Sequence, residues 1–262
     1  MMPSEVTYSN FLLACVPPSE LTRLVEIMSP APLIPGNVIY NVGDPMDVIY
    51  FPCGGLVSDM LFLGDGGCLE VLSVGREGAL GIGALYGAPN SFHKITVQMG
   101  GGAWKIHSTA LVRALESCPA LNDRLGRYFN SLFLQASQTA ICAGRHTIAQ
   151  RCAGKLVDAS EKSGSIRLPF THQCLASALG VRRAGITVAL AAFEHAGLIR
   201  CQHASIEILD ADLLREAACE CCASQRNVRP LAPDARAVRL SQAHESVREP
   251  TRAAPANLCV AR

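Results

Sequence analysis

The sequence has little charge, few aromatic residues and no long apolar run. Asp, Glu, Lys and Arg make up 17% of its 262 residues, and Phe, Trp and Tyr only 5%. Hydrophobic residues reach 49%, so the chain has ample material for a buried core and is not disordered throughout. No stretch approaches the roughly 18 consecutive apolar residues of a membrane helix. The segment before Leu12-Leu13-Ala14-Cys15 lacks the basic residues of a signal peptide, so we expect a cytoplasmic protein without a membrane partner.

Sequence motifs of several enzyme classes are also missing. The chain has no GxxxxGK phosphate loop, no histidine pair of the zinc-protease type and no nucleophile elbow. We therefore do not expect an enzyme.

The net charge of +1 is the sum of unlike segments. Residues 1–144 carry seven basic and eleven acidic groups, whereas residues 145–209 carry eight and four. A chain that is neutral overall does not bind every polyanion, so any contact with nucleic acid must use one local face. Residues 223–262 carry seven basic and three acidic groups and four of the fifteen prolines, which predicts a disordered basic tail.

Glycine is concentrated in one quarter of the chain, because 15 of the 22 glycines lie between Gly36 and Gly102. Short β-rich runs alternate with these glycines at a spacing of about ten residues, which is typical of a small antiparallel barrel or roll. We predict an α+β protein whose residues 10–117 form a β-roll of the jelly-roll (double-stranded β-helix) type, preceded by a short helix from Pro18 to Met28. The runs are 38–40, 48–51, 56–58, 69–72 and 95–97.

A long helix is predicted over residues 118–144, where apolar residues recur at helical spacing in two stripes. One stripe can cover the mouth of the roll and the other is left for a second copy of the helix. We assign the coiled-coil stripe to a dimer interface; a single core-facing helix in a monomer is the alternative. The interface residues are Leu121, Leu125, Tyr128, Leu132 and Gln135, and the second stripe is Phe129, Phe133, Ala136 and Ala140.

Residues 145–222 contain the most informative stretch, Thr171 to Arg200. Thr171 is a helix N-cap, Ala176 lies four residues before Gly180, and Ile186 lies six residues after it. This spacing is typical of a helix-turn-helix: a small residue allows close approach, a glycine makes the turn, and a β-branched residue joins the two helices. The runs 198–200 and 205–208 then predict a hairpin wing. A glycine-turn helix pair without a role in DNA binding is the structural alternative.

The first turn of the second helix is the part of such a motif that reaches base edges. Guanidinium groups there bind guanine or phosphate, and hydroxyl and amide groups serve either. The predicted DNA-binding residues are Thr171, Gln173, Arg182, Arg183, Thr187, Arg200 and His203.

The order of these parts resembles the Crp/Fnr family of bacterial transcription regulators over residues 10–222. The segment from Ile39 to Met60 is similar to the first part of the family's roll, and LASALGVRRAGITVALAAFEHAGLI is similar to its DNA-reading module. The resemblance implies a dimer that binds an inverted-repeat operator and contacts RNA polymerase. Arg183 matches the first arginine of the cyclic-AMP members' reader, but Ala184 and Val188 replace its glutamate and second arginine, which implies a different operator.

The sensor half departs from the family's cyclic-AMP pattern. That pattern places an arginine pair on the cyclic phosphate, whereas this chain has no arginine between Arg76 and Arg113. Cyclic AMP is therefore not expected, and the candidate ligand pocket consists of Arg76, Glu77, His93 and Lys94.

Twelve cysteines are spread through a chain that has core enough without disulfides, so buried thiols are expected. Their spacing does not fit the iron–sulfur cluster of the oxygen-sensing members. The dense group Cys219, Cys221 and Cys222 suits a metal or redox site, but no fourth ligand is evident nearby. We predict no cofactor.

Two functions remain after these exclusions. The first is a sequence-specific, dimeric DNA-binding regulator with an unknown signal. The alternative is a ligand-binding regulatory module whose helix pair contacts proteins, and a salt-dependent affinity for DNA decides between them.

Overall fold

The computed structural model describes residues 9–222, all within one compact unit. The predicted tail, residues 223–262, lies outside the described residues. The N-terminal part contains two helices, α2 (Phe11–Ala14) and α3 (Pro18–Ile27). Asn10 caps α2 and also donates hydrogen bonds from Nδ2 to the carbonyls of Pro52 (2.8 Å) and Gly78 (2.9 Å). This buried amide fastens the N-terminal helices to the roll.

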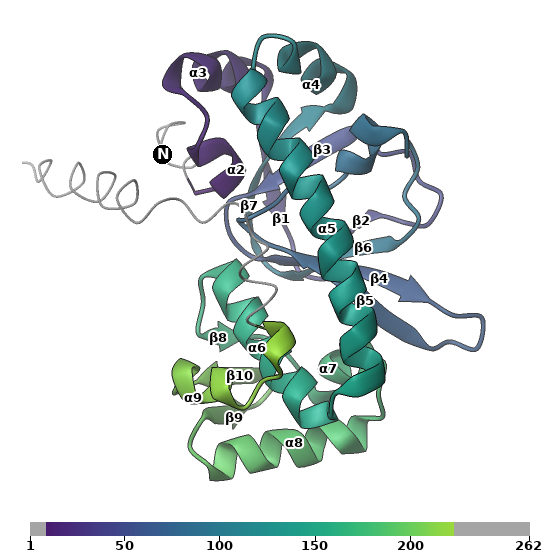
Figure 1. Ribbon diagram of the computed structural model, residues 1–262, viewed down its shortest axis with the longest axis vertical. Coiled ribbons are helices and arrows are strands. Elements are labelled where there is room, and N and C mark those ends of the chain that lie inside the picture. Colours follow the sequence, from purple (N-terminus) through teal and green to yellow (C-terminus); the bar gives the residue numbers. More distant parts are fainter. Residues whose placement is uncertain (1–8, 223–262) are drawn as a thin grey trace, which may run out of the picture. The chain divides into compact units, whose positions relative to one another are not determined.

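Two antiparallel sheets form the roll in the upper half of Figure 1. The three-stranded sheet has the order β1-β7-β3, and the four-stranded sheet β2-β6-β4-β5. All five predicted strands are present, and the α+β class is confirmed. The strands are β1 (Ser29–Leu33), β2 (Val38–Tyr40), β3 (Val48–Pro52), β4 (Leu56–Phe62), β5 (Cys68–Val74), β6 (Lys94–Met99) and β7 (Gly101–His107), with the short helix η1 (Ile82–Tyr86) between β5 and β6.

Two helices follow the roll, α4 (Ser108–Leu115) and α5 (Pro119–Arg145). Cys118 and Pro119 mark the boundary between them. Proline is tolerated at the first position of a helix, where its missing N–H costs nothing. At 27 residues, α5 is roughly 40 Å long.

The structure corrects the assignment of the two stripes on α5. Leu121, Leu125, Tyr128 and Gln135 are buried within the single chain, and Leu132 is partly buried. The first three pack with the buried residues of α2, α3 and β3. The predicted interface stripe therefore covers the roll and is unavailable to a partner. The stripe left exposed contains Phe129 and Phe133.

Residues 148–216 form the lower half of the structure in Figure 1, and their hydrophobic core also includes Leu56 and Met99 of the roll. A capping box at Thr147 and Gln150 starts the first helix, and Gly164, with φ of 73°, ends it. A three-stranded antiparallel sheet, β8-β10-β9, completes the unit. The elements are α6 (Ile148–Ser163), β8 (Arg167–Leu168), α7 (His172–Leu179), α8 (Arg183–His195), β9 (Ile199–Gln202), β10 (Ser205–Ile208) and α9 (Ala211–Glu216).

A buried polar network joins the roll to α5 and α6. The Lys162 side chain is only 3% exposed, and its Nζ lies 3.0 Å from Asp158 Oδ2 and 2.6 Å from the Ser73 carbonyl oxygen. The same Nζ donates to Gln135 Oε1 (3.4 Å) and lies 3.9 Å from Glu77 Oε1. Residues of β5, α5 and α6 thus share one buried ammonium group.

No single helix among residues 9–222 has the length and hydropathy of a membrane span. The pair α7 and α8 reaches that threshold only when counted together, and its axis bends by 115° at the break.

Candidate nucleic-acid interface

The pair α7 and α8 has the geometry of a helix-turn-helix. Thr171 Oγ1 accepts a hydrogen bond from Cys174 N (3.0 Å), which caps α7 as predicted. Gly180 ends α7 with φ of 62°, a conformation that glycine adopts without strain. The angle of 115° between the two helices falls within the range of this motif.

The two faces of α8 differ in chemistry. Its inner face is apolar and buried, with Ile186, Leu190 and Phe193 packed into the core. Gly185 allows α8 to approach α6 closely, because a Cβ at this position would lie 2.7 Å from Ile148 Cδ1. On the outer face Arg183 and Thr187 are exposed, in the first turn and a half of the helix. This is where a helix in the major groove meets base edges.

A histidine that sequence reasoning missed lies next to this face. His172 Nδ1 is 3.0 Å from Thr187 Oγ1, so α7 contributes a side chain that orients the hydroxyl. No local sequence signal marks His172, because the contact depends on how the two helices cross.

Gln173 and Arg182 have a different setting from Arg183. Both are exposed, but they also line a cavity of about 590 Å³ between the first helix of the motif and the β4–β5 hairpin. The hairpin reaches the turn of the motif: Cys68 Sγ donates to the Ser177 carbonyl oxygen (3.7 Å), and a Cβ at Gly180 would lie 3.2 Å from Leu69 Cδ1. The roll and the helix-turn-helix are therefore in direct contact.

The wing is the predicted hairpin, β9 and β10. His203 is exposed at its turn, and Arg200 is exposed on β9. Glu207 on β10 binds two guanidinium groups, with Arg200 at 3.2 Å and Arg167 at 3.3 Å. The carboxylate offsets part of the positive charge that these arginines present.

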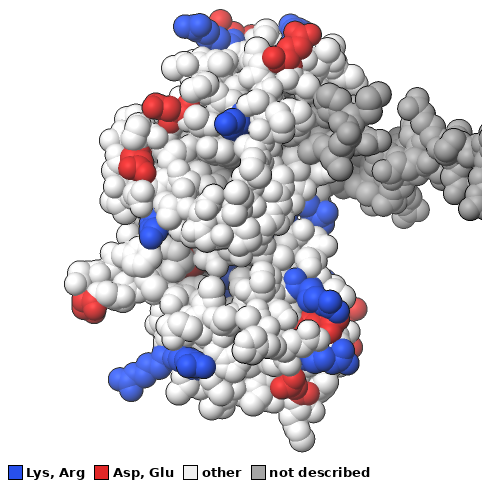
Figure 2. Space-filling view, turned by 180° about the vertical axis from the view of Figure 1, so that it is seen from behind, with Lys and Arg blue, Asp and Glu red and all other residues white. Residues whose placement is uncertain are grey.

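Basic side chains do not form one continuous surface on the face shown in Figure 2; they occur in small groups, some of which have acidic neighbours. This matches the modest surplus of basic groups over residues 145–209. On this face, no continuous basic surface is available for DNA.

The candidate ligand residues of the roll contact separate parts of the structure. The guanidinium of Arg76 lies 5.0 Å above the ring of Phe11, and Glu77 is buried near Lys162. These contacts tie the Arg76–Glu77 segment to the N-terminus and to α6.

His93 and Lys94 contact the neighbouring strand β4 instead. His93 Nδ1 lies 2.7 Å from Asp59 Oδ1, and this hydrogen bond raises the pKa of the imidazole. Lys94 Nζ lies 5.8 Å from the ring centre of Phe62. A common ligand site for the four residues stays a prediction.

Comparison with known proteins agrees with this architecture. Residues 150–217 match the model of the Crp-like helix-turn-helix domain. FixK2 of Bradyrhizobium japonicum has a similar structure, with a TM-score of 0.63 at 15% identity, over 74% of this chain and 98% of that chain. CLP of Xanthomonas campestris, a c-di-GMP-responsive global regulator, is similar at a TM-score of 0.60 and 16% identity, over 72% and 98%. A Crp/Fnr-family transcriptional regulator of Thermus thermophilus shares 22% identity at a TM-score of 0.56, over 72% and 98%.

No curated protein sequence matches the chain. The region that matches the family model includes the α7–α8 pair whose geometry is described above. The chain thus carries a Crp-like helix-turn-helix domain within the fold of the Crp/Fnr transcription regulators, as its sequence motifs predict.

Proposed function

We propose that this DNA-binding transcription regulator reads a specific operator as a dimer, with α8 in the major groove. The observation that carries the proposal is the two-faced α8: an apolar inner face fixed in the core, and an outer face that presents Arg183 and Thr187 at its start. A reader helix needs both, because the core must hold it rigidly while polar groups remain free for base edges.

Each residue on the outer face has a matching partner in the groove. Arg183 suits the O6 and N7 acceptors of guanine, and the Thr187 hydroxyl, held by His172, suits a base or a phosphate. Val188 is 71% exposed, and its methyl groups suit the methyl group of thymine. In this arrangement Arg200 and His203 on the wing would contact the phosphate backbone. RNA polymerase remains a predicted partner on the basis of the family resemblance alone.

The exposed stripe of α5 supports a dimer. Phe133 is 74% exposed, and Phe129, one turn before it on the same stripe, is 38% exposed. Large apolar side chains clustered on a surface mark an interaction site, and most homo-oligomers are twofold symmetric. A twofold dimer through this stripe requires an inverted-repeat operator with half-sites about 10 base pairs apart.

Selection of bound fragments from random DNA by the full-length protein tests this proposal. We expect an inverted repeat and an affinity that falls with salt. Arg183→Ala should then cost about 1–3 kcal/mol on the selected operator and relax the base preference at one position in each half-site.

Arg200→Ala is the matched control for that experiment. Loss of a phosphate contact should weaken binding to all sequences about equally and reduce the salt slope by about 1. An Arg183→Ala protein that keeps both the affinity and the base preferences of the wild type would refute α8 as the reader. Absence of any salt-dependent DNA affinity would favour the alternative module that contacts proteins.

We propose that the protein does not respond to cyclic AMP. Besides the missing arginine, Tyr128 packs against the segment that follows β5: its hydroxyl donates to the Ala79 carbonyl oxygen (3.3 Å), and a Cβ at Gly78 would lie 2.2 Å from that hydroxyl. The buried phenol thus occupies space beside the roll.

Calorimetry should accordingly detect no binding of cyclic AMP to the full-length protein. A ligand shifts operator affinity only through its differential affinity for two states, and without a phosphate anchor that difference is small. A micromolar dissociation constant would contradict this prediction.

A further inference from the structure

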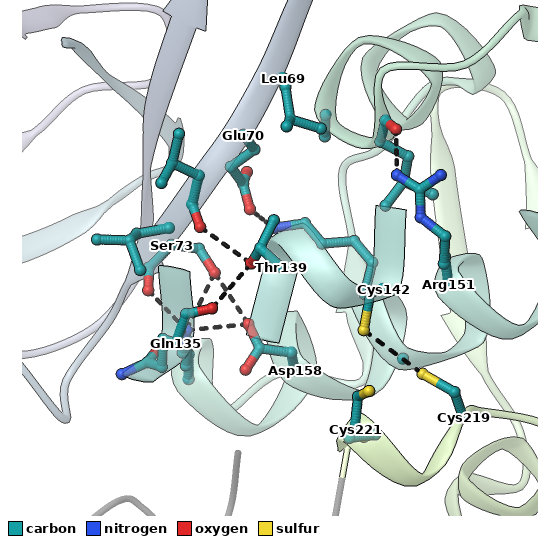
Figure 3. A pocket seen from close by; sticks show the side chains of 18 residues that line it. Leu69, Glu70, Ser73, Gln135, Thr139, Cys142, Arg151, Asp158, Cys219 and Cys221 are labelled. Carbon is teal, nitrogen blue, oxygen red and sulfur yellow. Dashed lines mark hydrogen bonds and ion pairs between the residues drawn. The ribbon is translucent and has the colours of Figure 1, made fainter. Parts of the chain in front are cut away.

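Four metal-ligand side chains converge where α5 ends. Cys142 and His146 lie one turn apart at the C-terminal end of α5, and Cys219 and Cys221 come from the segment after α9. One potential ligand atom from each of the four lies within 4.8 Å of the other three. Cys142 and Cys219 point toward each other and Cys221 lies beside them, at the edge of a cavity of about 100 Å³ (Figure 3).

The distances in this cluster fit a tetrahedral ion. With Zn–S bonds of about 2.3 Å and Zn–N bonds of about 2.0–2.1 Å, a tetrahedron has an S···S edge of about 3.8 Å and an S···N edge of about 3.6 Å. The Sγ atoms of Cys142 and Cys219 are 3.8 Å apart. The Sγ atom of Cys221 is 3.6 Å from His146 Nδ1. Two edges thus have the required length before any rearrangement.

The surroundings of the cluster orient it for an ion. His146 directs Nδ1 at the thiols while its Nε2 lies 3.2 Å from Glu220 Oε1, the arrangement in which a carboxylate fixes the tautomer of a metal-binding histidine. Gln138 Nε2 donates to Cys221 Sγ, which suits a thiolate. Arg151 lines the same cavity and offsets part of the negative charge that three thiolates around a dication would leave.

We propose that Cys142, His146, Cys219 and Cys221 bind one structural zinc ion. Three sulfurs and one imidazole nitrogen form a closed tetrahedral set, and soft thiolate ligands select zinc over the oxygen-binding cations calcium and magnesium. On binding, the three thiols release their protons to the solvent and the zinc keeps its oxidation state. Cys222, which sequence reasoning grouped with Cys219 and Cys221, lies outside the set.

A redox pair is the competing use of these thiols. The sulfurs of Cys142 and Cys219 are 3.8 Å apart, well beyond the roughly 2.05 Å of a disulfide bond. A disulfide between them would also leave Cys221 and His146, whose ligand atoms lie in the same cluster, without a role. The geometry therefore favours a metal over a disulfide switch.

The ion would act on the connection between sensor and reader. His146 is the C-cap of α5 and Thr147 is the N-cap of α6, so only these two residues connect the helices. Zinc would fasten the end of α5 to the end of the reader domain beyond α9. A bound ion would fix the orientation of the helix-turn-helix domain relative to α5. An effect of the ion on DNA binding rests on the proposed function, whereas the metal site itself does not.

Metal content of the full-length protein tests the site without DNA. The protein is stripped with a chelator under reducing conditions, loaded with Zn²⁺, desalted and measured by mass spectrometry. We expect one zinc per chain, and loss of this stoichiometric zinc in Cys142→Ser and Cys219→Ser. Cys201→Ser, which changes a cysteine of β9 outside the cluster, should still hold one zinc per chain.

Two further measurements apply if the cysteine variants fold poorly. Co²⁺ in the wild type should show the intense visible bands of a tetrahedral thiolate site. Glu220→Gln should keep the stoichiometry but weaken zinc affinity by about tenfold, because it loosens the hold on His146. Glu220 is 80% exposed, so this substitution spares the fold.

Several outcomes would overturn the site. They are a wild-type protein without stoichiometric zinc, a Cys142→Ser variant that binds zinc as well as Cys201→Ser does, and a Cys142–Cys219 disulfide that persists under reducing conditions. Zinc binding without operator binding would leave the site standing and refute the proposed function instead. If the zinc site and the proposed function are both correct, removal of zinc should lower the affinity for the operator.

Discussion

Lys162→Met is expected to lower the free energy of unfolding by about 3–5 kcal/mol. The ammonium group is nearly inaccessible and is shared by Asp158 and Glu77, with further hydrogen bonds to Ser73 and Gln135. Methionine has similar volume but no charge, so two carboxylates would remain buried without their counter-ion. Removal of one partner from such a network costs far more than the network itself contributes.

Urea denaturation of the full-length protein measures this loss as a lower midpoint at unchanged slope. Arg127→Met is the matched control, since it breaks the exposed pair of Arg127 with Asp123 (3.0 Å) and should cost less than about 1 kcal/mol. If Lys162→Met unfolds at the same urea concentration as Arg127→Met, the network has no structural importance.

Phe133→Glu should convert the dimer into monomers. A twofold interface would bring two copies of the new carboxylate together in an apolar contact, and the dimer dissociation constant should rise by about 100-fold or more. Sedimentation velocity measures the change in mass. Because Phe133 is largely exposed in the single chain, its replacement should leave the circular dichroism of the protomer unchanged.

Arg127→Glu is the control for this substitution, because it introduces the same carboxylate on α5 at an exposed position about 120° around the helix from Phe133. It should remain dimeric. An unchanged mass for Phe133→Glu would refute the exposed stripe as the interface. Leu125→Glu, by contrast, should unfold the protomer, because Leu125 is fully buried against the roll.

The reader was predictable because its signals are local. The Thr171 cap, the Gly180 turn and the buried Ile186 each depend on a few neighbouring residues, and all three are confirmed. The roll was predictable in outline from glycine spacing, but β1 and β7 were missed. The strand β1 contains two prolines, Pro30 and Pro32, which are tolerated only because it lies at the edge of its sheet.

The two stripes of α5 show what the periodicity of the sequence does not predict. Both are apolar at helical spacing, so periodicity alone does not say which one faces the roll. The three-dimensional packing buries Leu121 and Leu125 and leaves the bulkier Phe129 and Phe133 exposed. Large aromatic side chains are therefore not by themselves a sign of burial.

The metal cluster depends on both kinds of information. Cys142 and His146 are four residues apart, a spacing that places two residues on one face of a helix, but the predicted helix ended at residue 144 and left His146 outside it. Their meeting with Cys219 and Cys221 depends on how α9 packs against α6, and no local pattern encodes that contact.

The contact between the β4–β5 hairpin and the helix-turn-helix limits how far the two halves are interchangeable. Leu69 packs closely against the Gly180 turn, where an added Cβ would lie 3.2 Å from Leu69 Cδ1, so the shapes of the hairpin tip and the turn are matched. A chimera that joined this reader to the roll of another regulator would place an unmatched hairpin against the turn. Natural recombination between such regulators should therefore preserve the hairpin and the turn together, and protein engineers who exchange readers should transplant both.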